Sequence, residues 1–412
     1  MSRSSPPGAD GPSDQPADIE PPALSPETIL AVRDLSTRFY TNDGRVNAVE
    51  SLDFEVRSGE VFGVVGESGS GKSVTGLSLL DLVDSPGEIT SGEIWLRNGR
   101  LAEAYRERRP DAVRDGFVDL RRLPAAEWHS LRGRTFGMIF QDPMSSFSPT
   151  HTVGAQIAEA VEIERRSTGP DDSTDYGLGS LVLGAVLPSK RFIKETSRQR
   201  AIELLNRVGI PDAKNRATDY PHQFSGGMLQ RAMIAQALAG KPDLLIADEP
   251  TTALDVTIQA QILTLLESLK EDQEMGIIFI THDLGVIARV ADRIGVMYAG
   301  EIVERGTPAD IFENHVHPYT AGLFGSSPDM GVSDRSRNRL TPIEGTVPSL
   351  LDHELGDGCY FADRCPKAME ECLTKPPEFD VNEDHGIKCY LADRPYDPDR
   401  ALDSHGLTGD PQ

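Results

Sequence analysis

The sequence predicts an α/β fold with a mostly parallel sheet that is covered on both faces. Short, nearly continuous apolar runs at residues 60–65, 244–248 and 277–281 are typical of strands buried on both sides. Segments of helical period alternate with these runs, which favours a parallel sheet. The chain has 412 residues, of which 38% are hydrophobic, enough for one large core with appendages or for two domains.

The elements can be followed in order along the chain. Apolar and polar residues alternate over 29–35 and again over 49–56, which indicates two strands. The apolar run of 60–65 leads through a glycine-rich loop into a helix that we expect at 72–80. The helical period returns over 197–208, and the other two buried strands follow.

The domain organisation follows from changes in composition. The N-terminal residues are rich in Pro, Ser, Gly and Asp without any period, so we expect a disordered acidic tail. Residues 101–118 are strongly charged, and residues 165–195 mix Gly, Ser and Asp, so both are predicted to be surface inserts. The chain then divides into a tail, a main α/β domain, a Cys-containing extension and a second disordered tail, at residues 1–27, 28–312, 313–395 and 396–412.

The charge of the chain limits its environment and its partners. The net charge is −24, and only nine of the 41 basic residues are Lys. An acidic, Lys-poor surface repels itself unless salt screens it, so we interpret the composition as a halophilic adaptation to a saline cytoplasm; an ordinary acidic protein is the alternative. No basic face stands out, which disfavours binding to nucleic acid.

No segment is predicted to cross a membrane. No apolar run approaches the roughly 20 residues that a spanning helix needs, and the longest candidate, 178–187, is too short. The residues after Met1 lack the apolar core of a signal peptide. We therefore expect a cytoplasmic protein that reaches a membrane only through a partner.

A glycine-rich loop follows the first buried strand. It consists of Gly66, Glu67, Ser68, Gly69, Ser70, Gly71, Lys72 and Ser73, and it fits the pattern G-x-x-x-x-G-K-[ST]. In such a loop backbone N–H groups bind phosphate oxygens, the Lys reaches the β- and γ-phosphates, and the Ser hydroxyl ligates Mg²⁺. A purely structural turn is the alternative, but the position between a buried strand and a helix favours a phosphate loop.

Polar residues follow three of the predicted strands. Asp248 and Glu249 end a buried strand, where unpaired carboxylates would be costly to bury. We expect Asp248 to bind Mg²⁺ and Glu249 to polarise the attacking water, rather than two acids that are simply exposed. Gln141 could sense metal or water, and His282 could contact a γ-phosphate, although a lone His more often has a structural role.

These features together resemble the nucleotide-binding subunit of an ABC transporter over about residues 30–320. Residues 224–228 resemble the family signature, with Met228 where many members have Gln. The resemblance implies Walker A at 66–73, Walker B at 244–248, the catalytic Glu249, a D-loop at Ala253, Leu254 and Asp255, a Q-loop at Gln141 and a switch His at His282. It also implies a P-loop NTPase fold of ABC type, with a mixed sheet core, a helical subdomain and an antiparallel edge sheet.

The resemblance implies further contacts with the nucleotide. The helix that Ser225, Gly226 and Gly227 open would present its positive N-terminal end to the γ-phosphate held by a second subunit. An aromatic residue upstream of the loop would stack on adenine, and Phe39 and Tyr40 compete for this role. Ser73, Gln141 and Asp248 would hold Mg²⁺, and Asp255 would lie near the nucleotide.

Four short segments narrow the resemblance to the dipeptide and oligopeptide importer branch, which also includes nickel importers. They are residues 140–144, 220–223, 255–259 and 317–320. Residues 358–361 and 364–366, with two further Cys, are similar to the C-terminal extension of that branch.

This branch implies an ATPase that energises the import of dipeptides or oligopeptides, with ATP and Mg²⁺ as cofactors. Nickel or oligosaccharide cargo is an alternative, because this subunit does not touch the cargo. The implied partners are a second ATPase subunit in a homo- or heterodimer, two membrane permeases and an external binding protein. The chain would then lie peripherally at the cytoplasmic face of the membrane. A soluble ABC ATPase acting on DNA or ribosomes is disfavoured, because the chain has neither long coiled coils nor a second cassette.

All four cysteines lie in the extension, with the spacing C-x₅-C-x₆-C-x₁₆-C. Disulfides are rare in the cytosol, and the spacing lacks the close pairs of common zinc modules. Four thiolates can hold an iron–sulfur cluster, and the importer branch includes members described with one. We therefore predict a [4Fe–4S] cluster on Cys359, Cys365, Cys372 and Cys389, with zinc or no metal as the alternatives.

Overall fold

The core of the protein is an eight-stranded sheet. The computed structural model describes residues 24–168, 194–252, 254–326, 343–351 and 357–395. The strands of this sheet, in spatial order, are β12 (Phe379–Asp380), β13 (Gly386–Ile387), β11 (Glu301–Gly306), β10 (Arg293–Tyr298), β3 (Val61–Val65), β9 (Gly276–Thr281), β8 (Leu244–Asp248) and β7 (Phe136–Ile139). The five strands from β10 to β7 are parallel, as the apolar runs predict, and the other three pair antiparallel.

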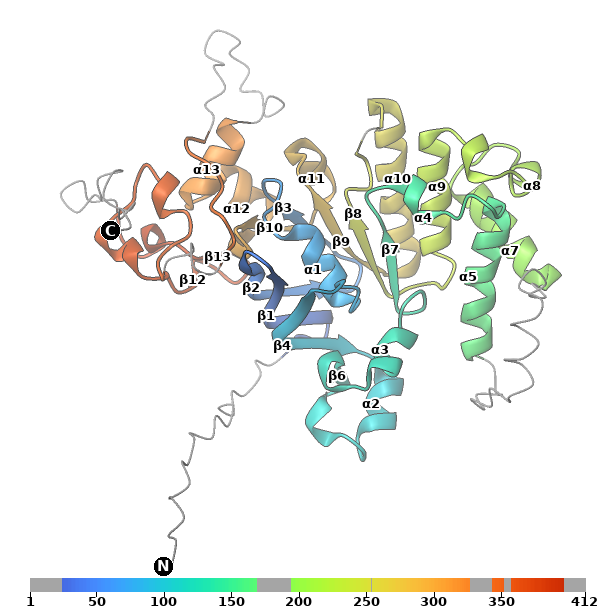
Figure 1. Cartoon of the computed structure of the whole chain (residues 1–412), viewed down its shortest axis with the longest axis horizontal. Helices are drawn as coiled ribbons and strands as arrows, with labels where there is room; N and C mark the ends of the chain where they lie inside the picture. Colours follow the sequence, from blue (N-terminus) through green and yellow to red (C-terminus); the bar gives the residue numbers. More distant parts are fainter. Residues whose placement is uncertain (1–23, 169–193, 253, 327–342, 352–356, 396–412) are drawn as a thin grey trace, which may run out of the picture.

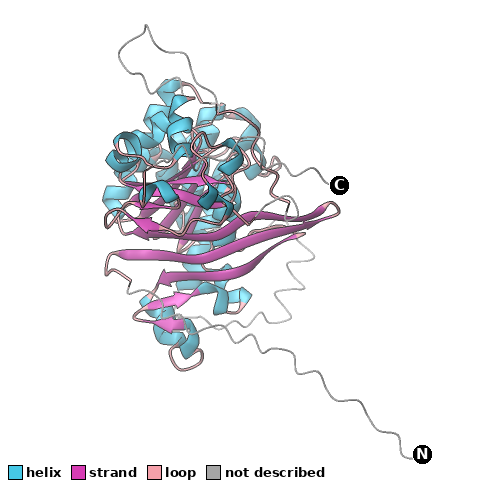
Figure 2. Ribbon diagram, turned by 90° about the vertical axis from the view of Figure 1, so that its left-hand side faces the viewer, coloured by secondary structure: helices cyan, strands magenta, loops and turns pink. Residues whose placement is uncertain are grey.

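A second, antiparallel sheet packs against one face of the core sheet (Figure 2). Its order is β2 (Gly44–Arg57), β1 (Thr28–Thr41), β4 (Gly87–Arg97), β6 (Phe117–Asp119) and β5 (Val113–Arg114). Leu30 and Phe54 of this sheet share one apolar cluster with Phe62 and Ile278 of the core sheet. The helix after the glycine-rich loop contributes Leu79 to the same cluster, so the antiparallel sheet packs against that helix.

Helices cover the other face of the core sheet and form a group at one end of the molecule (Figure 1). The helices of the chain are α1 (Lys72–Leu79), α2 (Gly99–Tyr105), α3 (Ala125–Ser130), α4 (Pro143–Ser146), α5 (Val153–Thr168), α7 (Glu195–Arg207), α8 (Ala213–Arg216), α9 (Gly226–Ala237), α10 (Val256–Gln273), α11 (Leu284–Val290), α12 (Pro308–Glu313) and α13 (Pro318–Gly325). Apolar residues of α5, α7, α9 and α10 form one cluster with the core strands. The helices expected at 72–80 and 197–208 are confirmed to within two residues at each end.

The C-terminal extension continues the core sheet, which its sequence did not predict. Strand β13 pairs with β11, and β12 pairs with β13, so the short strands cover an otherwise open edge. Glu304 of β11 is fully buried at this junction, accepts a hydrogen bond from the Val316 amide at 2.8 Å and lies 3.1 Å from His385 Nε2. Buried charged groups of this kind need partners, so the extension and the main domain depend on each other.

The first insert lies only partly on the surface. Residues 103–104 and 106–111 are exposed, as the charge of residues 101–118 predicts, but Ala102, Phe117 and Val118 are buried, and β6 extends the antiparallel sheet by pairing with β4. These few apolar residues are buried because strand pairing turns their side chains toward the core, although the segment as a whole is strongly charged. Most of the second insert, the apolar run 178–187 and nearly all of both tails lie outside the described residues.

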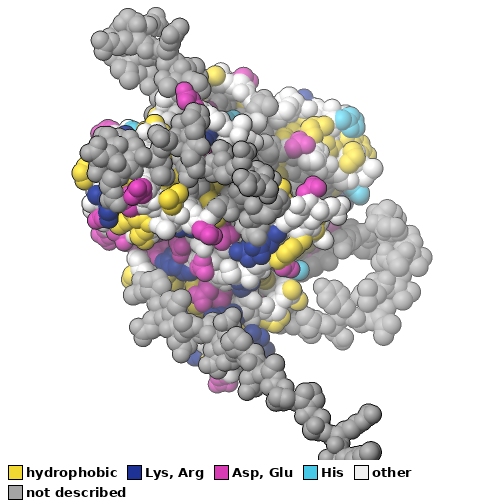
Figure 3. Space-filling view, turned by 60° about the vertical axis from the view of Figure 1, so that its left-hand side comes forward, with side chains coloured by type: hydrophobic (Ala, Val, Ile, Leu, Met, Phe, Trp, Pro, Cys, Tyr) yellow, Lys and Arg dark blue, Asp and Glu magenta, His cyan; other side chains and the backbone are white. Residues whose placement is uncertain are grey.

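The described surface mixes the two signs of charge. On the face shown in Figure 3, acidic and basic side chains lie interspersed, without a broad basic patch. Among the described residues, no helix has both the length and the apolar character that a membrane crossing requires.

Candidate nucleotide site

The glycine-rich loop connects β3 to α1, as the sequence predicts. Gly71 caps α1 with φ +103°, in the left-handed region that favours glycine. A Cβ atom there would lie 2.3 Å from the carbonyl oxygen of Ala48, and a Cβ on Gly66 would lie 2.1 Å from that of Met297. Neither position therefore has room for a side chain.

Lys72 points back into the loop. Its Nζ donates to the carbonyl oxygens of Gly66 at 2.9 Å and Glu67 at 2.8 Å. Burial lowers the pKa of Lys72, and the nearby carboxylates of Glu249 and Asp248 oppose this shift. The ammonium group is thus placed inside the loop, next to the acids that end β8.

Ser73 and Asp248 meet although 175 residues separate them. The Ser73 hydroxyl donates to Asp248 Oδ1 at 3.0 Å, because α1 begins beside the end of β8. Burial raises the pKa of Asp248, and the Ser73 hydrogen bond counteracts it. A hydroxyl and a carboxylate oxygen are ligands that Mg²⁺ accepts, so this pair fits the predicted metal site.

The Glu249 carboxylate forms hydrogen bonds with three other side chains. Its carboxylate accepts from Gln141 Nε2 at 3.0 Å and Thr252 Oγ1 at 2.8 Å, and it lies 2.9 Å from His282 Nδ1. Its backbone has φ +47°, which costs a non-glycine residue on the order of 1 kcal/mol. Burial raises the pKa of Glu249, but the hydrogen bonds and nearby cations outweigh it and hold the pKa below its usual range.

Thr252 is a contact that the sequence analysis missed. It lies three residues after Glu249 and on the same turn, since the Thr252 amide donates to the Glu249 carbonyl oxygen at 3.2 Å. A hydroxyl residue so soon after the acidic pair that ends β8 was the available signal.

The predicted signature residues and D-loop stand at the N-terminal ends of two helices, α9 and α10. Ser225 caps α9 by accepting from the Met228 amide at 3.3 Å, and Asp255 caps α10 by accepting from the Thr257 and Ile258 amides. Among the described residues, no hydrogen bond links Ser225 or Asp255 to Lys72 or Glu249. Ala253 of the predicted D-loop lies outside the described residues.

The side chains of Phe39 and Tyr40 leave β1 on opposite faces, because neighbouring residues of a strand alternate. The ring of Phe39 lies over Gly87, its partner on β4. Phe39 shares its face with Thr37, whose hydroxyl lies 2.8 Å from that of Ser78 on α1. Tyr40 is 48% exposed. Phe39 therefore lies on the face of β1 that meets α1, the helix that follows the glycine-rich loop.

Glu67 makes contacts that no sequence pattern predicted. Its amide donates to the Tyr319 hydroxyl at 2.9 Å, and its carboxylate accepts from Arg364 Nη1 at 2.9 Å. Arg364 is 297 residues away in the chain.

The four cysteines gather in the extension. The Cys359 amide donates to the Cys372 carbonyl oxygen at 2.9 Å. Burial raises the pKa of the Cys365 thiol to about 12 and that of Cys389 to about 11, and neighbouring thiols add to the shift in both. Within the described part of the chain, however, no group of three or more His, Cys, Asp or Glu side chains is arranged to hold a metal ion. The geometry therefore does not support the [4Fe–4S] prediction.

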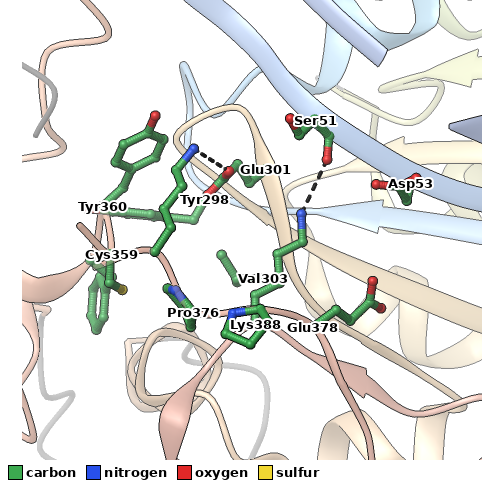
Figure 4. A pocket seen from close by; sticks show the side chains of 13 residues that line it. Ser51, Asp53, Tyr298, Glu301, Val303, Cys359, Tyr360, Pro376, Glu378 and Lys388 are labelled. Atoms are coloured by element: carbon green, nitrogen blue, oxygen red, sulfur yellow. Dashed lines mark hydrogen bonds and ion pairs between the residues drawn. The ribbon is translucent and has the colours of Figure 1, made fainter. Parts of the chain in front are cut away.

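A pocket of about 310 Å³ lies between the extension and the two sheets (Figure 4). Lys375 pairs with Glu301 at 2.8 Å, and Lys388 donates to the Ser51 carbonyl oxygen at 3.2 Å, so both cations on its wall have partners. No residue of the glycine-rich loop lines it, and it is not the nucleotide site.

Comparison with known proteins agrees with this geometry. Residues 49–252 match the family model of the ABC transporter, and residues 303–372 match that of the oligopeptide/dipeptide transporter, C-terminal region. The dipeptide transport ATP-binding protein DppD of Bacillus subtilis (strain 168) is 42% identical over 89% of this chain and 96% of its own. The oligopeptide transport ATP-binding protein OppD of the same organism is 44% identical over 88% of each chain.

A solved structure shares the fold. The ATP-binding cassette MJ0796, solved as a dimer in a post-hydrolysis state bound to ADP and Pi, aligns with a TM-score of 0.52 and 23% identity. The alignment covers 68% of this chain and 99% of that one. This likeness concerns the fold alone. The sequence relatives and the family models show that the chain belongs to the ATP-binding proteins of ABC transporters, in the group that carries the oligopeptide/dipeptide transporter C-terminal region.

Proposed function

We propose that this chain binds and hydrolyses ATP to energise the import of dipeptides or oligopeptides. The observation that carries the ATPase assignment is the convergence of Lys72, Ser73, Asp248 and Glu249 at one edge of the core sheet. The peptide cargo is supported by relatives whose names specify dipeptide and oligopeptide transport. Nickel or oligosaccharide cargo has no comparable support.

Each residue of the site has a proposed role. Lys72 exchanges its loop carbonyl partners for the β- and γ-phosphates. Ser73 and Asp248, with Gln141, would hold Mg²⁺, and the ion would neutralise charge on the phosphates. Glu249 polarises the attacking water, and Gln141 and His282 orient its carboxylate through their hydrogen bonds. The lowered pKa of Glu249 keeps it ionised for this task.

The signature residues serve a second subunit in this proposal. Ser225 fixes the start of α9, and a Cβ on Gly226 would meet no atom within 4 Å, so the N-terminal end of this helix is open. A helix N-terminus attracts phosphate. Two ATPase subunits facing head to tail would each complete the site of the other, with Asp255 near the shared interface.

The proposed assembly contains this chain, a second ATPase subunit, two permeases and an external binding protein. The ATPase would lie peripherally at the cytoplasmic face of the membrane. Reconstitution of the complex in proteoliposomes tests the function. ATP hydrolysis should rise with peptide-loaded binding protein, and hydrolysis that ignores peptides but responds to nickel or an oligosaccharide would refute the cargo.

The iron–sulfur cluster stays a prediction that rests on the four thiols and on family resemblance. Iron and acid-labile sulfide can be measured in protein purified without oxygen, together with absorbance near 400 nm. A colourless, iron-free protein would refute it.

A further inference from the structure

Glu67, the second residue of the glycine-rich loop, is held at three points. Its amide donates to the Tyr319 hydroxyl at 2.9 Å, and its carbonyl oxygen accepts from Lys72 Nζ at 2.8 Å. Its carboxylate binds the guanidinium of Arg364 through two nitrogens, at 2.9 and 3.3 Å. Tyr319 and Arg364 both lie beyond residues 49–252, the part that matches the ABC transporter family.

Arg364 is itself fixed by the extension. Its Nε donates to the Glu344 carbonyl oxygen at 3.1 Å, and its Nη1 lies 3.2 Å from the Tyr298 hydroxyl. The guanidinium also lies over the rings of Tyr298 and Phe361, 5.7 and 5.9 Å from their centroids. Its side chain is only 5% exposed. A guanidinium with its stem and plane both packed presents a rigid two-pronged donor.

Two consequences follow for the loop. A bidentate Arg–carboxylate pair fixes both position and orientation, so Arg364 holds Glu67 where its carbonyl oxygen meets Lys72. The pair also neutralises the Glu67 carboxylate, which would otherwise stand unpaired in the loop that receives a triphosphate. An unpaired carboxylate at this position would repel the negatively charged phosphates.

We propose that Arg364 of the C-terminal extension is a positioning residue for ATP: through Glu67 it fixes the glycine-rich loop and removes a negative charge that would oppose the triphosphate. The inference rests on the proposed ATPase function. It makes the extension part of the nucleotide site rather than a separate appendage.

The test is a double-mutant cycle on the full chain in its assembled complex, measuring the KM for ATP and kcat. Arg364→Met should raise KM roughly tenfold, the scale of one charge-assisted hydrogen bond, and leave kcat within about twofold. Glu67→Gln alone should bind ATP at least as tightly as the wild type. The double variant should recover most of the lost affinity, and Arg364→Lys should lie between the wild type and Arg364→Met.

Arg305→Gln is the matched control. Arg305 ties β11 to the same extension through Glu378 at 2.6 Å and Asp380 at 3.0 Å, away from Glu67. Its loss should leave the KM for ATP unchanged within about twofold. An equal KM rise in Arg305→Gln and Arg364→Met would show a merely structural role.

Other outcomes also decide the matter. The proposal is overturned if Arg364→Met has the wild-type KM for ATP. It is also overturned if the KM of the double variant is as high as that of Arg364→Met. If Arg364→Met does not assemble, weaker ATP binding by Glu67→Gln overturns it and unimpaired binding supports it. A wild-type complex that does not bind ATP at all refutes the ATPase function instead.

Discussion

His282 Nδ1 lies 2.9 Å from Glu249 Oε1, although 33 residues separate the two in the chain. The cause is the parallel pairing of β8 and β9, in which Asp248 stands opposite Ile280. The residues that follow each strand therefore meet at the same edge of the sheet. Gln141, just beyond β7, joins them for the same reason. Substitutions at this edge of the sheet therefore test the proposed ATP hydrolysis.

Replacing Glu249 by Gln should abolish ATP turnover and keep ATP binding. The amide retains the size of the side chain but cannot polarise water as a carboxylate does, and general-base groups of this kind contribute at least about 100-fold to rate. Equilibrium binding of a fluorescent ATP analogue and phosphate release measure the two properties separately. Near-normal turnover by Glu249→Gln would refute the role given to Glu249.

The chain should hydrolyse ATP poorly by itself. We assign Lys72 and Glu249 to one nucleotide and the helix that Ser225 opens to the nucleotide of another subunit. Phosphate release by the isolated chain and by the chain mixed with its partner ATPase compares the two states. Equal activity per chain at high dilution, where dimers dissociate, would contradict the shared site.

Thr252→Val should move the acid limb of the pH–activity profile to higher pH. Burial raises the pKa of Glu249, and the hydrogen bonds from His282 and Thr252 lower it. Without the Thr252 hydroxyl the ionised carboxylate of Glu249 is less stabilised, so it takes up a proton at a higher pH. Activity should therefore fall at a higher pH as the solution is acidified. Thr264→Val, at an exposed position of α10, is the control and should leave the profile unchanged. An identical acid limb in wild type and Thr252→Val would show that this hydrogen bond does not tune Glu249.

Phe39→Ala should weaken ATP binding more than Tyr40→Ala. Phe39 shares its face of β1 with Thr37, which contacts α1, whereas Tyr40 points to the other face. Loss of a base-stacking ring costs roughly tenfold in affinity. Isothermal titration with ATP compares the two variants. A greater loss in Tyr40→Ala would assign the adenine contact to Tyr40 instead.

The sequence predicted the site better than it predicted the surroundings of the site. Buried parallel strands produce continuous apolar runs, and polar residues directly after them, such as Asp248 and His282, are visible as interruptions. The contact of Arg364 with Glu67 left no such trace, because it depends on how the extension folds back over β11. The burial of Phe117 was missed for a similar reason, since strand pairing rather than composition turned it inward.

Salt should stabilise the protein if its acidic surface is a halophilic adaptation. The net charge of −24 repels itself at low ionic strength, and the Debye length falls from about 10 Å at 0.1 M salt to about 3 Å at 1 M. The Tm should therefore rise as KCl increases over this range. Glycerol at matched osmolality is the control and separates screening from general exclusion. A Tm that stays flat with KCl would favour an ordinary acidic protein.

His317 should make the stability of the protein depend on pH. The residue caps α13 by accepting from the Tyr319 amide at 3.0 Å, and burial lowers its pKa to about 3. In the unfolded chain a His takes up a proton below about pH 6.5. Between these two values the unfolded state binds more protons, so the free energy of unfolding should fall as the pH falls from 6.5 towards 3.

The variant His317→Asn isolates this contribution. Asn can cap the helix with its side-chain oxygen but does not titrate, so α13 and the Tyr319 contact with Glu67 should persist. Urea unfolding from pH 8 to pH 5 should show a smaller loss of stability in His317→Asn than in the wild type. Other titrating groups contribute equally to both proteins, and His151→Asn, at an exposed His whose side chain, among the described residues, forms hydrogen bonds only with the hydroxyls of Ser148 and Thr150, should follow the wild type. Parallel curves of stability against pH for the wild type and His317→Asn would mean that His317 accepts a proton while α13 and the Tyr319 contact with Glu67 stay folded.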